Sequence, residues 1–169
     1  MRIVGAIVVI FIIFPSAPAT GDSLYLQIYQ PERKEVLLKF PVVSGDRFRI
    51  RYTHSSDLTP VVDHFVIVEA GKMILEEEEF RWYGSGLEFR STPDARVVLD
   101  DHRTRVFLHR PFVYIPIRVG RVAGHHVEIN GLSIPLRRVA KGGERVWIRV
   151  VSDIAFGYTA DQEGEINGR

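Results

Sequence analysis

The chain has 169 residues, of which 46% are hydrophobic and 25% charged, so it can bury one core and is too polar for a protein with many membrane spans. Its 22 basic and 21 acidic side chains nearly cancel, and this balance excludes a strong long-range attraction to nucleic acid or anionic lipid. Cysteine is absent, which excludes thiol nucleophiles, disulfides, thiolate zinc sites and iron–sulfur clusters.

Residues 1–19 have the pattern of an export signal. Arg2 provides the positive start, residues 3–14 the apolar stretch, and Ala17-Pro18-Ala19 the small-residue pattern that precedes cleavage. An apolar run of roughly 10 to 14 residues is typical of a signal-peptide core, whereas a spanning helix needs about 20. We therefore predict a cleaved signal, with an uncleaved anchor as the alternative. The domain over residues 20–160 is expected to be extracytoplasmic: secreted, periplasmic, or anchored and facing outward.

After the signal, apolar residues recur with the period of a β-strand. In residues 47–52 every second side chain is large and apolar and the others are arginine, which predicts a strand with one buried face. Similar segments rich in β-branched and aromatic residues predict further strands. These segments are 24–29, 36–40, 64–69, 73–80, 97–99, 105–109, 113–119, 125–129 and 146–151.

Turn residues separate these segments. Asn130-Gly131 is the clearest, because both central positions of a type I′ turn need a positive φ, and it predicts a hairpin. A single helical turn is expected at most at residues 94–101 or in the tail. The sequence therefore predicts an all-β fold, a single antiparallel β-sandwich or partly open barrel of about ten short strands, followed by a polar tail over residues 161–169.

The densest polar chemistry lies in residues 52–60, directly after the clearest strand. His54, Ser55 or Ser56, and Asp57 have the residue types of a hydrolytic triad. Triad members usually come from distant chain positions, and there is no Gly-x-Ser-x-Gly motif. The sequence therefore predicts no catalytic residue and favours a protein that is not an enzyme. The alternative use of this segment is a hydrogen-bonded loop in which Ser and Asp satisfy backbone donors.

Metal binding is a second possibility that the residue types raise. His54, Asp57, Asp63 and His64 fall within eleven residues, and His125-His126 adds two imidazoles. No established ligand spacing is present, and adjacent strand residues point to opposite faces. The run of glutamates at 76–79 suggests calcium only weakly, since a solvated or edge strand explains it equally well. The sequence thus predicts neither a metal site nor a cofactor.

A second feature is the segment 81–87, where an aromatic pair precedes two glycines. Trp82 and Tyr83 can wall a pocket, and Gly84 and Gly86 allow close approach of a ligand; a bulge or turn is the structural alternative.

Three segments together resemble a known family. They are Tyr-Thr-His-Ser-Ser-Asp-Leu-Thr-Pro-Val-Val-Asp at 52–63, Leu-Glu-Glu-Glu-Glu-Phe at 75–80 and Tyr-Gly-Ser-Gly-Leu at 83–87. Their order and spacing resemble the uncharacterised prokaryotic domain family of unknown function numbered eighteen-fifty. Ser56, Asp57 and Ser85 depart from the usual pattern of that family, Asp57 with conservation of charge. The family has no established activity.

The resemblance implies an extracytoplasmic accessory or ligand-binding domain, because such proteins are often encoded or fused beside TAXI-type tripartite (TRAP) solute transporters. The expected partners are membrane transporter subunits and a small polar solute, and no nucleic acid. On this hypothesis a polar pocket is lined by His54, Ser55, Asp57 and Thr59, with Tyr52 also in contact with the ligand. Asp63 and Glu76 orient these side chains, and the turn from Gly84 to Gly86 closes one side of the pocket. The alternatives are a protein–protein interaction module without a small ligand, and a hydrolase that uses His54 as a general base.

Overall fold

The computed structural model describes residues 23–55, 58–81, 94–100 and 103–153. The predicted signal at 1–19 and the predicted tail at 161–169 lie outside this part of the chain. Within it the chain forms eleven strands and one short 3-10 helix. These are β1 (Leu24–Gln30), β2 (Glu35–Val42), β3 (Arg47–Thr53), β4 (Pro60–Glu69), β5 (Lys72–Phe80), β6 (Ala95–Asp100), β7 (Arg103–Phe112), β8 (Tyr114–Arg118), β9 (His126–Ile129), β10 (Leu132–Pro135), η1 (Leu136–Arg138) and β11 (Arg145–Ser152).

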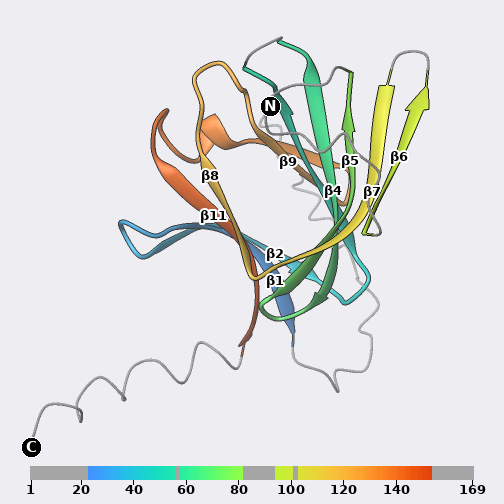
Figure 1. Ribbon diagram of the computed structural model, residues 1–169. Helices are drawn as coiled ribbons and strands as arrows, with labels where there is room; N and C mark the ends of the chain where they lie inside the picture. Colours follow the sequence, from blue (N-terminus) through green and yellow to red (C-terminus); the bar gives the residue numbers. More distant parts are fainter. Residues whose placement is uncertain (1–22, 56–57, 82–93, 101–102, 154–169) are drawn as a thin grey trace, which may run out of the picture.

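The strands form two antiparallel sheets that face each other. The small sheet has the order β2-β1-β11-β8 and the large sheet the order β10-β9-β3-β4-β5-β7-β6. Figure 1 shows β7 bending into β8, so that the chain passes from the large sheet to the small one. The prediction of an all-β, sandwich-like domain is confirmed, and the described strands do not close into a barrel.

The core lies between the two sheets because the strands alternate as their sequences predict. On β3, Phe48 and Ile50 are buried while the arginines between them are exposed. Phe48 stacks on Phe65 of β4 with ring centroids 5.0 Å apart. Leu26 and Ile148 of the small sheet are also fully buried in this core. Each such side chain contributes about 1.5–3 kcal/mol by leaving water.

The predicted hairpin at Asn130-Gly131 is confirmed. Asn130 has φ 49° and Gly131 has φ 77°, and the two residues join β9 to β10. Ile129 pairs directly with Leu132 across the turn. The turn chemistry therefore sets the register of this hairpin.

Two local predictions are wrong. Residues 95–100 form strand β6, which confirms the strand predicted at 97–99 and excludes a helical turn there, because they pair with β7 along their whole length. The glutamates at 76–79 do not lie on an edge strand, since β5 is paired on both sides, with β4 and with β7. Within the described residues, no helix has the length and hydrophobicity needed to cross a membrane.

Candidate functional site

A partly buried carboxylate interrupts the apolar face of the large sheet. Asp63 of β4 lies between the core residues Val61 and Phe65 on the side that faces the small sheet. It pairs with Ile50 of β3 on one side and with Glu78 of β5 on the other. The sequence contained a sign of this placement. Alternate residues of a strand point to the same face, so Asp63 is on the same face as the apolar Val61, Phe65 and Ile67.

Two acidic side chains and one arginine share this inner face. Glu78 is only 9% exposed, and its Oε1 lies 4.0 Å from Nη1 of Arg110 on β7. Burial raises the pKa of Asp63 to about 7; the charge of Glu78 adds to this rise and the charge of Arg110 opposes it. Burial, followed by the charges of Asp63 and Glu78, also raises the pKa of Tyr52. Asp63 is therefore poised to hold a proton near neutral pH.

A cavity of about 230 Å³ opens beside Asp63, between the large sheet and β8. Its wall is formed by Ile50, Tyr52, Asp63, Ile115, Pro116, Ile117, Arg118 and His125. The rings of Tyr52 and His125 stack with centroids 5.4 Å apart. Burial lowers the pKa of His125, and the neighbouring His126 lowers it further, so the imidazole is held neutral. The cavity thus presents a carboxyl group, a neutral imidazole and a guanidinium.

Two polar atoms of this cavity are buried without a hydrogen-bond partner among the described residues: Asp63 Oδ1 and His125 Nδ1. A buried polar atom that makes no hydrogen bond costs about 1–3 kcal/mol. Such atoms are rare in folded proteins and are often explained by a bound molecule or a functional role. The cavity therefore has the hydrogen-bonding capacity to hold a small polar molecule.

The structure places the predicted pocket residues in different surroundings. Tyr52 and Asp63 meet at the cavity. His54 and Thr59 are partly buried in the loop between β3 and β4, where His54 N donates to Thr59 O at 2.8 Å, and Ser55 is exposed. These three loop residues are not part of the cavity wall. This connection is therefore braced by its own backbone.

Glu76, also predicted for the pocket, lies on the opposite side of the large sheet. Its Oε2 is 3.2 Å from Nε of Arg47; the Arg47 side chain is largely exposed and that of Glu76 partly exposed. The predicted pocket residues Asp57, Gly84 and Gly86 lie outside the described residues.

Sequence reasoning missed Arg118 and Arg110, considered His125 only as a candidate metal ligand, and considered Glu78 only as part of an acidic run that could reach the histidine loop. Glu78 could have been found because it lies two residues before the buried Phe80 and therefore on the same face of the strand. For His125 and Arg118 the sequence carries no comparable signal, because they reach the cavity from a loop and from the other sheet.

The outward face of the same strands carries a different polar group. His64 of β4 and Glu77 and Glu79 of β5 place one imidazole and two carboxylates near one another. Within the described residues these are the side chains whose chemistry and spacing suit a metal ion.

Comparison with known proteins gives one match. A family model described as a domain of unknown function, DUF1850, matches residues 48–136. This range contains Glu78 and every residue of the cavity wall. No curated protein and no solved structure matches the chain.

Proposed function

The chain belongs to the DUF1850 family, and on this premise we propose that it is an extracytoplasmic domain that binds a small polar solute in the cavity between its two sheets. The observation that carries the proposal is the pair of buried atoms without partners, Asp63 Oδ1 and His125 Nδ1, on the wall of one cavity. A bound solute would supply the hydrogen bonds that the described residues do not.

The size and lining of the cavity define the class of ligand. About 230 Å³ is below the range of about 300–1,000 Å³ that is usual for drug-sized ligands, so the solute has few heavy atoms. A protonated Asp63 donates one hydrogen bond and accepts others, a neutral His125 does both, and Arg118 only donates. A compact molecule with both donors and acceptors, such as a small hydroxylated or carboxylated metabolite, satisfies this set.

The proposed place of action is supported by the sequence and by the family resemblance. Residues 1–19 have the pattern of an export signal, and the resembled proteins often stand beside TAXI-type TRAP transporters. We therefore assign the domain an accessory role in which it holds a solute outside the cytoplasm beside such a transporter.

Native mass spectrometry tests the binding directly. The purified chain is incubated with a metabolite extract of its source and gently desalted before measurement. We expect a retained extra mass in the wild-type protein and its loss in Asp63→Asn, because the amide cannot offer the same donor and acceptor pattern as a carboxyl group. The matched control is Asp153→Asn, which alters an exposed aspartate that bonds Tyr25 and Lys39 and should keep the extra mass.

The opposite result has a definite meaning. If the wild-type chain emerges with a bare protein mass, or if Asp63→Asn retains the extra mass as fully as Asp153→Asn does, the cavity is not the binding site. The interaction module without a small ligand would then be the better explanation, and a search for a membrane partner would follow.

A further inference from the structure

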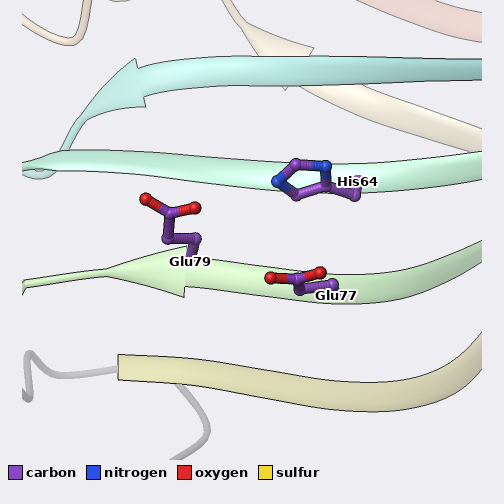
Figure 2. A group of neighbouring side chains, drawn as sticks. All are labelled: His64, Glu77 and Glu79. Carbon is purple, nitrogen blue, oxygen red and sulfur yellow. The ribbon is translucent and has the colours of Figure 1, made fainter. Parts of the chain in front are cut away.

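Three potential metal ligands lie on the outward face of the large sheet, on the side of β4 and β5 that faces away from the cavity. His64 is the direct cross-strand partner of Glu77, and Glu79 lies two residues farther along β5. Because side chains of a strand alternate, Glu77 and Glu79 share one face and Glu78 lies on the other. Figure 2 shows the imidazole and both carboxylates on this common face, with one ring nitrogen on the side of Glu79.

The three candidate ligand atoms lie near one another, although farther apart than around a bound ion. One ligand atom from each residue can be chosen so that all three lie within 4.8 Å of one another. Bonds of about 2.0–2.2 Å to a tetrahedral ion place neighbouring ligand atoms roughly 3.3 Å apart. Binding of an ion therefore requires the three ligand atoms to move closer together, through a change in the torsions of the glutamate side chains.

One ring nitrogen of His64 has the capacity to act as a ligand. The Nε2 atom is buried and has no hydrogen-bond partner among the described residues. The neighbouring Arg49 directs its guanidinium to Glu128 of β9, with Nη2 and Oε2 2.8 Å apart.

The two carboxylates are held in place by arginines of β7. Arg105 contacts both oxygens of Glu77, and Arg103 Nη1 lies 2.9 Å from Glu79 Oε1. A carboxylate has about four lone-pair sites, so it can accept these hydrogen bonds and still bind an ion. Such contacts to ligating carboxylates are usual in metal sites, where they fix the orientation of the ligands.

We propose that His64, Glu77 and Glu79 bind a divalent ion of the zinc class on the outward face of the large sheet. One imidazole with two carboxylates suits zinc and related ions, whereas calcium and magnesium prefer an all-oxygen set with more ligands. Three protein ligands leave the fourth position of a tetrahedral ion open to water or to an external group. This site does not depend on the solute cavity, which lies on the other face of the same sheet.

Zinc binding by the metal-free chain is the direct test. The full chain, prepared without a histidine tag and dialysed against a chelator, is titrated with zinc alone by calorimetry, and native mass spectrometry gives the stoichiometry. We expect one zinc ion per chain, and we expect His64→Ala and Glu79→Gln each to weaken the affinity by at least about tenfold. Cobalt should give the visible absorption of a tetrahedral complex in the wild-type chain and not in His64→Ala.

Matched controls separate this site from adventitious binding. His109→Ala removes an exposed imidazole of β7, and Glu76→Gln removes a carboxylate of the same glutamate run that pairs with Arg47. Both should bind zinc as the wild type does. Failure to bind one equivalent of zinc overturns the proposal, as does an equal loss in His64→Ala and His109→Ala. Circular dichroism of each variant confirms that it is folded, and the conservative His64→Gln replaces His64→Ala if the latter is not.

Discussion

Asp63 and His64 are consecutive residues of β4 whose side chains lie on opposite faces of the large sheet. Asp63 lines the cavity between the sheets, and His64 faces outward beside Arg49 and Glu77. The alternation of a strand thus separates two polar sites across one peptide bond. Each site can be altered by substitution without removing a side chain of the other.

Asparagine at position 63 should remove a pH dependence of stability. The folded pKa of Asp63 is about 7, above its ordinary value of 3.8, so folding favours the protonated form. The resulting stabilisation is complete below about pH 4 and is lost as the pH rises through about 7. Relative to Asp63→Asn, the wild-type free energy of unfolding should fall by about 2.5 kcal/mol between about pH 5 and pH 8.

Urea denaturation at several pH values measures this difference. The groups that face Asp63 or line its cavity, namely Tyr52, Glu78, Arg110, Arg118 and His125, all remain in the variant. Asp153→Asn should follow the wild-type curve because Asp153 is exposed. Parallel curves for the wild type and Asp63→Asn would show that Asp63 is ionised in the folded protein throughout this range.

Phenylalanine at position 125 should abolish solute retention while the domain stays folded. The phenyl ring can keep the stacking on Tyr52 but lacks the Nδ1 atom that has no partner among the described residues. Removing a buried polar atom without a partner costs no hydrogen bond, so the melting temperature should stay the same or rise. Native mass spectrometry and thermal denaturation of the same sample measure both effects. Undiminished retention would remove His125 from the site.

The sequence was sufficient to predict ten of the eleven described strands and the clearest turn. Strand β3 reads as alternating arginine and apolar residues, and Asn130-Gly131 has the residues that a tight hairpin requires. Both are local properties, so they can be recognised without knowing which strands are neighbours.

The candidate sites depend on relationships that no local pattern contains. The cavity requires His125 from a loop and Arg118 from the small sheet. The proposed metal site requires the strand register that places His64 opposite Glu77. Irregularities of pairing after His64 and Leu75 change which glutamates face outward. The parity of Asp63 with buried neighbours was the one local sign of the cavity.

Alanine at position 131 should destabilise the hairpin through the backbone alone. Gly131 has φ 77°, and a Cβ built there would contact nothing within 4 Å, so no steric clash contributes. An L-residue in this region of φ costs about 1–2 kcal/mol. Urea denaturation should show a loss of about 1 kcal/mol for Gly131→Ala. Gly142→Ala is the control, because Gly142 does not have a positive φ and its Cβ would meet only a flexible arginine side chain; an equal loss in both would refute the explanation.

Lysine at position 105 should weaken zinc binding with little effect on folding. Arg105 places Nε 2.5 Å from Oε1 and Nη2 3.2 Å from Oε2 of Glu77, a paired contact that a single ammonium cannot reproduce. Exposed ion pairs contribute little to stability, so the free energy of unfolding should stay near that of the wild type. If Glu77 is a zinc ligand, its orientation is lost in Arg105→Lys and calorimetry should give an affinity lower by about tenfold. Arg47→Lys is the control, because the partner of Arg47 is Glu76, and it should leave the zinc affinity unchanged. Equal zinc affinities in Arg105→Lys and Arg47→Lys would mean that Arg105 does not position a ligand.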